Sequence, residues 1–189
     1  MKKIIILIIF LLLFLGGNNY QELNSIAIIT NIAIEKDKDN YKVTFQEVIP
    51  TKEESKIAKK YKYYTNTNNT LENAFNNLSE DITKNIYLEH LENIIIKDNN
   101  IDTVFQLEKV LKNDLDNFNI ILSESNPKKI LEYSNNYKYI NSLIKDNITL
   151  RSIKKAKLEH KEIKLPIIKI DNNRLVFYKY KMIGDDSNE

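Results

Sequence analysis

The sequence contains no cysteine and no tryptophan, and it has only three glycines and three prolines among 189 residues. Without cysteine the chain can form no disulfide, no thiolate zinc or iron–sulfur site and no thiol nucleophile. The three glycines leave no room for a glycine-rich phosphate loop or a dinucleotide-binding fingerprint. These absences exclude most cofactor chemistry, so we expect no cofactor. The length is sufficient for one or two small domains with a buried core.

An excess of one charge is also missing. Lys and Arg total 28 and Asp and Glu total 26, which gives a formal net charge of +2. Two of the cations, Lys2 and Lys3, precede an apolar run, and without them the two signs balance and are interspersed. A nucleic-acid-binding protein needs a basic face that releases counterions from the phosphates. We therefore expect no nucleic-acid partner.

The first 17 residues predict a signal peptide or signal anchor. Lys2 and Lys3 are followed by twelve unbroken apolar residues, Ile4–Leu15, and then by Gly16 and Gly17, which is the order of an export signal. As a helix the run is ~18 Å long, shorter than the ~30 Å hydrocarbon core of a bilayer. This favours an export signal over a spanning helix, although lysines that snorkel leave a retained anchor open. The rest of the chain is expected to be membrane-associated on the extracytoplasmic face.

The pattern of apolar residues predicts a β-hairpin at each end of the remaining chain. Residues 25–34 contain five isoleucines, a charged turn follows, and residues 41–46 alternate apolar and polar side chains, as in a half-buried strand. Residues 165–170 and 175–183 predict the second hairpin, with a turn at 171–173. In its second strand, alternation predicts Tyr178 and Tyr180 on one face and Lys179 and Lys181 on the other.

Helices and buried strands alternate between the two hairpins. Thr70 is a predicted N-cap for a helix that includes Leu71, Ala74 and Leu78, and Ser125–Pro127 is typical of another helix start. The other expected elements are strands at 91–96 and 118–122 and helices at 101–111, 137–145 and 149–161; residues 51–69 are expected to form a long polar loop. A strand–helix–strand unit over 91–122 predicts a parallel pair. The fold class is therefore α+β, a mixed β-sheet with an N-terminal hairpin and helices packed on it.

No linker rich in proline or serine divides the chain, and we expect three segments. These are residues 1–17 as the export or anchor segment, residues 18–146 as an α+β domain, and residues 147–189 as the start of a second, truncated segment.

Few residues are candidates for chemistry. His90 and His160 each lie in a Leu-Glu-His-x-Glu string, but this spacing does not match a ligand helix such as H-E-x-x-H, so we expect no metal site. Basic and aromatic residues alternate at 59–64 and at 178–181, a pattern that can stack on bases or contact lipid headgroups. No serine lies in a G-x-S-x-G elbow, and we expect no catalytic residue and no enzyme activity.

Several motifs in order resemble one family. The stretch 19–37 contains Glu22–Leu23, an apolar strand and a charged turn; Asn68–Ala74 resembles a Gly-x-Thr-x-x-x-Ala helix start; and His90–Ile96 resembles a Gly-His strand. On these blocks the chain resembles the N-terminal portion of the Ger(x)C spore germination proteins, the C subunits of nutrient germinant receptors. Gly17 stands where that family has its lipid-bearing cysteine, and Asn31 and Ala33 replace two glycines.

The resemblance implies a non-enzymatic protein that takes part in nutrient-triggered germination. It implies as partners the membrane-embedded A and B receptor subunits, and as location the inner membrane of a spore. Without a cysteine at position 17, the apolar segment itself would be the tether. The alternative is an extracytoplasmic binding module unrelated to germination.

Overall fold

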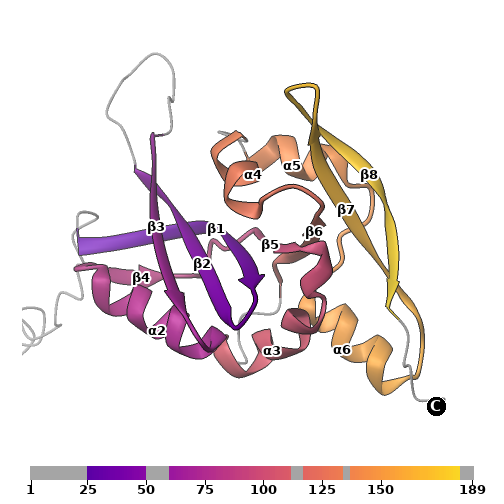
Figure 1. The fold of residues 1–189 in the computed structure, drawn as a ribbon, viewed down its shortest axis with the longest axis horizontal. Helices are drawn as coiled ribbons and strands as arrows, with labels where there is room; N and C mark the ends of the chain where they lie inside the picture. The colour runs from indigo at the N-terminus through magenta and orange to yellow at the C-terminus, as the bar shows by residue number, and fades with distance from the viewer. Residues whose placement is uncertain (1–24, 50–59, 112–116, 134–136, 184–189) are drawn as a thin grey trace, which may run out of the picture.

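The fold is organised around one eight-stranded mixed sheet, seen in a computed structural model that describes residues 25–49, 60–111, 117–133 and 137–183 (Figure 1). In sheet order the strands of the main path are β3 (Lys60–Asn68), β2 (Asn40–Ile49), β1 (Ile26–Asp37), β5 (Asn93–Lys97), β6 (Asn119–Ser123), β7 (Ile163–Asp171) and β8 (Arg174–Ile183). The short strand β4 (Asn85–Tyr87) pairs with the beginning of β1. β1, β5, β6 and β7 are parallel, and the outer pairs on both sides are antiparallel.

Helices cover both faces of this sheet (Figure 1). They are α2 (Leu71–Asp81), α3 (Asp102–Val110), α4 (Pro127–Tyr133), α5 (Tyr137–Leu143) and α6 (Leu150–Leu158), with a short 3-10 turn at Asp98–Asn100. Buried side chains of α2, α3 and α6 belong to one hydrophobic cluster, and those of α4 and α5 belong to a second cluster on the opposite face. The predicted fold class, a mixed sheet with helices packed on it, is confirmed.

The central strands explain why the core forms where it does. In β5, Ile94 and Ile96 join the first cluster and Ile95 joins the second, because successive side chains of a strand point to opposite faces. All three are fully buried, and each contributes about 1.5–3 kcal/mol relative to an exposed side chain. β6 repeats this pattern, and the β5–α3–β6 unit is parallel, as predicted.

Local sequence signals start the helices where they were expected. The side chain of Thr70 accepts a hydrogen bond from the backbone of Asn73 at the start of α2, which confirms the predicted cap. Asn126 caps α4 by accepting from the backbone N–H of Lys129. At α6, Thr149 and Ser152 form a capping box in which each side chain bonds to the other residue's backbone N–H.

Two strands differ from the sequence-based prediction. Residues 60–68, expected to be part of a polar loop, form β3 and pair with β2 along their whole length; residues 50–59 lie outside the described chain. Lys60–Asn68 contains few apolar residues because β3 is an edge strand, half of which faces solvent. β4 was not predicted, since three residues are too few to show a period.

The sheet and the first cluster continue past residue 146, where a domain boundary was predicted. β7 pairs in parallel with β6, and Leu150, Ile153, Leu165 and Ile167 belong to the same cluster as Ile32 and Ile94. The C-terminal hairpin is therefore part of this sheet. Whether residues 147–189 form a separate folding unit stays a prediction, and the predicted segment 1–17 lies outside the described residues.

Candidate interaction surface

The helix α6 carries a concentration of positive charge. Its sequence is LRSIKKAKL, in which Leu150 and Ile153 are buried while most of the cations are exposed. The four cations are Arg151, Lys154, Lys155 and Lys157, and Lys154 forms an ion pair with Glu108 at 3.4 Å. Leu158 at the end of the helix is 81% exposed, the most exposed large apolar side chain among the described residues. An amphipathic helix thus buries one stripe and presents a basic one to solvent.

The β7–β8 hairpin adds a second set of cations around an aromatic ring. Asn172 and Asn173 both have positive φ, 46° and 56°, as a two-residue hairpin turn requires. A bulge next to Ile167 inserts Tyr178 as an extra residue in β8. The Nζ atoms of Lys169 and Lys179 lie 4.3 and 5.0 Å from the centroid of the Tyr178 ring, within the range of a cation–π interaction.

The bulge also changes which side chains share a face. Alternation predicts Tyr178 and Tyr180 on one face, but the ring of Tyr180 packs at a tilt against Phe177, with centroids 5.0 Å apart, whereas Tyr178 contacts the two lysines. This part of the prediction was wrong because an inserted residue shifts the phase of a strand by one. As a result, Tyr178 joins the basic face of the hairpin.

Register shows that this basic face is on the same side of the sheet as α6. Lys181 lies directly opposite Leu165, and Ile183 opposite Ile163, and cross-strand partners share a face. Leu165 belongs to the same cluster as Ile153 of α6. The Nζ of Lys181 donates to the backbone carbonyl of Asp98 at 2.8 Å, which fixes its position on this side.

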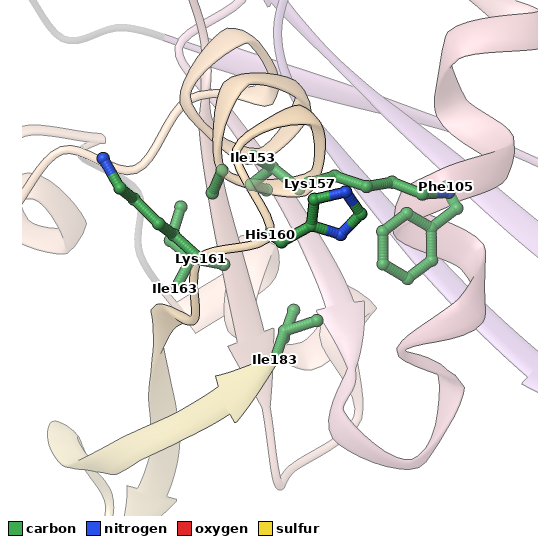
Figure 2. Close-up of a pocket in the computed structure, with 8 residues that line it drawn as sticks. Phe105, Ile153, Lys157, His160, Lys161, Ile163 and Ile183 are labelled. Atoms are coloured by element: carbon green, nitrogen blue, oxygen red, sulfur yellow. The ribbon is translucent and has the colours of Figure 1, made fainter. Parts of the chain in front are cut away.

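A small pocket joins α6 to the hairpin (Figure 2). It has a volume of about 40 Å³, and its wall combines Phe105 of α3 with Lys157, His160 and Lys161 from α6 and the residues after it, and with Ile183 of β8. The Nζ of Lys157 lies 4.9 Å from the centroid of the Phe105 ring. Lys161 donates to Glu159 at 2.8 Å, and this hydrogen bond holds the pKa of Glu159 below its usual value. We call this pocket together with Leu158, Lys169, Tyr178 and Lys179 the basic surface.

The charge of this region departs from that of the whole chain. Residues 150–183 contain ten Lys and Arg and three Asp and Glu, a formal charge of +7, whereas the whole chain carries +2. The tail that follows, residues 184–189, contains three acids and lies outside the described residues. We had expected positive and negative charges to be evenly interspersed along the chain, and in this region they are not. A count over the whole chain missed the asymmetry, and a count by segment finds it.

The structure places the two histidines in different settings. His90 is exposed in the turn before β5, and its ring makes an edge contact with Tyr87, with centroids 5.5 Å apart. His160 lines the pocket at the end of α6 with a positive φ of 50°. In the described ranges, no group of three or more His, Asp or Glu side chains gathers in a way that could hold a metal ion.

A row of polar side chains, which we call the amide row, crosses the sheet beneath α4, and it was not predicted from the sequence. The Asn93 amide donates to Oδ1 of Asn31 at 2.9 Å, the Asn119 amide donates to Oδ1 of Asn93 at 3.3 Å, and the Asn31 amide donates to Oε1 of Gln46 at 2.5 Å. Gln46 and Tyr63 both donate to the carbonyl of Leu131 in α4. The row therefore connects five adjacent strands and fastens a helix to them. Burial raises the pKa of Tyr63 above its ordinary value.

The sequence does contain a signal for this row. The three central parallel strands each contain an Asn-Ile step, at residues 31, 93 and 119. Because the three asparagines have the same phase relative to the buried isoleucines, they meet in one register position.

A buried carboxylate supports the opposite edge of the sheet. Glu47 of β2 is 1% exposed, accepts from the Tyr64 hydroxyl at 2.7 Å and forms an ion pair with Lys84 at 2.6 Å. The hydrogen bond from Tyr64 and the charge of Lys84 compensate the burial of the Glu47 carboxylate, because an unpaired buried charge is strongly destabilising. The arrangement fastens the chain after α2 to β2 and β3.

A wider groove of about 600 Å³ lies between α2, β4 and the end of α3. Its wall is apolar at Phe45, Phe75 and Ile86, and its polar groups include Tyr87 and Glu89. Tyr87 donates to the Glu89 carboxylate, and this hydrogen bond raises the pKa of Tyr87. The polar pair is thus satisfied within the chain.

The geometry defines an α+β domain whose most distinctive exposed feature is a basic and aromatic surface. The sequence matches a family model described as spore germination protein N-terminal domain over residues 19–161. This match covers well over half of the chain, which therefore belongs to that family, and it confirms the resemblance seen in the sequence motifs.

Comparison with individual proteins gives less information about the chain than the family model does. No curated protein matches the sequence. Among solved structures, the chain is similar to the one titled crystal structure of the GerBC protein, with 14% identity and a TM-score of 0.40. The similarity covers 84% of this chain and 49% of the GerBC chain, so the chain spans about half the length of that protein. Within the described part of the chain, no helix is long and apolar enough to cross a membrane.

Proposed function

We propose that the chain takes part in nutrient-triggered spore germination as a non-enzymatic subunit of the type found as the C component of germinant receptors. The observation that carries this proposal is the match to the spore germination protein N-terminal domain over residues 19–161. Strands and helices from β1 to α6 lie within that range.

The proposal includes a location and partners. The chain would lie on the extracytoplasmic face of the inner spore membrane and assemble with the membrane-embedded A and B subunits. The support for export is the basic and apolar segment 1–17 of the sequence. Because position 17 is glycine, the tether would be the apolar segment rather than a thioether-linked lipid.

The different settings of the buried and the exposed polar side chains support a binding role rather than a catalytic one. The most deeply buried polar side chains, such as Asn93 and Glu47, are engaged with other side chains of the chain itself. They hold strands and helices together. The exposed cations and aromatic rings, by contrast, face outward at the basic surface, where they are accessible to a partner.

Gene deletion in the spore-forming host tests the proposal. We expect the deletion to slow or abolish germination triggered by nutrients while leaving germination by an agent that bypasses the receptors unchanged. Reintroduction of the full chain should restore the response, and affinity purification of a tagged copy from spore membranes should recover polytopic subunits. Unchanged nutrient germination, together with no co-purifying membrane subunit, would contradict the proposal. Expression during growth rather than sporulation would favour the alternative, a binding module unrelated to germination.

A further inference from the structure

We infer that the basic surface of α6 and the β7–β8 hairpin docks on an anionic lipid bilayer. This goes beyond a role in germination and does not depend on it, because it follows from the charges and side chains of one face of the domain. It is also separate from the tether predicted at residues 1–17, because it involves the folded domain itself.

Charge is the first argument. Residues 150–183 carry a formal charge of +7, and part of this charge is assembled on one side of the sheet from two elements. Lys157 and Lys161 line the junction between α6 and the hairpin, and Lys169 and Lys179 flank Tyr178 further along it. Clusters of four to eight lysines and arginines are attracted to the negative potential of anionic lipid surfaces.

The second argument is the chemistry of the side chains between the cations. Tyr178 is 41% exposed and Leu158 is 81% exposed, so an aromatic ring and an aliphatic side chain are both accessible beside the cations. Tyrosine is enriched at membrane interfaces, since its ring is apolar and its hydroxyl is polar. Peripheral membrane proteins combine cations that reach the headgroups with apolar side chains that enter the acyl boundary. The basic surface contains both kinds.

Shape is the third argument, because it favours a bilayer over other anionic partners. The two concavities next to α6, one lined by Lys157 and His160 and one by Glu108 and Lys154, have volumes of only about 40 and 50 Å³, too small to seat a drug-sized ligand. β8 is an edge strand, but its bulge and its lysines hinder the addition of another strand. A shallow surface that carries cations and exposed apolar groups suits a bilayer.

The absence of tryptophan from the sequence makes a direct test simple. In the full chain, Tyr178→Trp places a single tryptophan between Lys169 and Lys179, and Thr67→Trp places one at an exposed position on β3, the opposite edge of the sheet. Each variant is mixed with vesicles of phosphatidylcholine alone, or of phosphatidylcholine and phosphatidylglycerol in equal parts, with and without brominated acyl chains. We expect a blue shift and bromine quenching for Tyr178→Trp with phosphatidylglycerol only, and neither for Thr67→Trp.

Charge variants provide the second half of the test. In the Tyr178→Trp background, Lys157→Gln, Lys169→Gln and Lys179→Gln together should lower the ratio of docked to undocked protein on the order of a hundredfold. Lys60→Gln, Lys62→Gln and Lys129→Gln, which remove the same charge from β3 and α4, should change it little. Circular dichroism is recorded for both triple variants, and only variants with the spectrum of the original protein are compared. High salt should also reverse the blue shift and the bromine quenching of the Tyr178→Trp variant, because it screens the attraction between the lysines and the lipid headgroups.

Three results would overturn the inference. Equal quenching of the Tyr178→Trp fluorophore in both kinds of vesicle would show that charge does not direct docking. An equal response of the Thr67→Trp variant would show that the basic surface is not the contact. A shift of the Tyr178→Trp emission with heparin or DNA but not with phosphatidylglycerol vesicles would assign the surface to a soluble polyanion. Because none of these measurements involves germination, they remain decisive whether or not the gene deletion has a phenotype.

Discussion

Single residues in the amide row determine how the central strands are held together. Asn93 is fully buried, donates to Asn31 and accepts from Asn119. A buried polar group that loses its partner keeps its desolvation cost without the compensating hydrogen bond. The asparagines therefore stabilise the sheet only as a set, and each depends on its neighbours.

Asn93→Ala tests this dependence. We expect a loss of about 1–3 kcal/mol in the free energy of unfolding, because the substitution leaves an acceptor on Asn31 and a donor on Asn119 unpaired. Chemical denaturation followed by circular dichroism measures it. Asn99→Ala, at an exposed asparagine outside the row, is the matched control and should stay within about 0.5 kcal/mol of the original. Equal losses in the two variants would mean that the row has no special role.

Tyr63 at the end of the row predicts a change of stability at high pH. Because burial raises its pKa in the folded state, the unfolded chain loses this proton first as pH rises through about 10. The stabilising contribution is complete below that pH and decreases above it. In Tyr63→Phe the free energy of unfolding should be lower at neutral pH, because the hydrogen bond of the hydroxyl is lost. Above about pH 10 it should decline less steeply than in the original protein. Parallel curves for both proteins across that range would refute this account.

At the scale of elements, α6 shows how a helix with a polar sequence is placed. It has only two buried side chains, Leu150 and Ile153, and isolated helices of this length are marginal in water. The capping box at Thr149 and Ser152 supplies partners for backbone groups that the helix itself leaves unpaired.

Replacement of the cap should therefore be visible in stability. Thr149→Ala removes the side-chain acceptor for the Ser152 backbone N–H, and we expect a loss of about 0.5–2 kcal/mol in the free energy of unfolding. Thr149→Ser keeps the hydroxyl and should lose much less. If the alanine and serine variants are equally stable in urea unfolding, the cap does not hold the helix.

The elements that could be predicted from the sequence are those with a clear period or cap. The two hairpins, the parallel β5–β6 pair and the starts of α2 and α4 follow from alternation, apolar runs and capping residues. β3 could not be recognised, because its half-exposed residues are mostly polar, and its identity as a strand comes from pairing with β2. The basic surface was missed because its cations are averaged out in the total charge, and the bulge at Tyr178 is a tertiary feature without a sequence period.

At the scale of the whole molecule, the sheet unites segments that we expected to be separate. β7 pairs with β6, and the first hydrophobic cluster includes side chains from β1 through Ile167. A protein that ended at residue 146 would expose the edge of β6 that β7 covers and would lose α6 from the core.

Truncation measures whether this union is required for folding. We expect a chain that ends at Asp146 to lack cooperative thermal unfolding, because the buried residues Leu150, Ile153, Leu165 and Ile167 are removed. A chain that ends at Ile183 is the control and should unfold cooperatively. Cooperative unfolding of the shorter chain, followed by circular dichroism, would instead support an independent domain before residue 147.

The amide row has a consequence for the kinetics of folding. Because side chains alternate, a slip of β5 by one residue would move Asn93 to the opposite face and bring Ile94 into its place. The donors and acceptors of Asn31 and Asn119 would then face an isoleucine, and such a pairing would be short-lived. Among strands whose isoleucines are nearly interchangeable, the three asparagines thus favour one alignment, and refolding is expected to proceed without long-lived intermediates of shifted register.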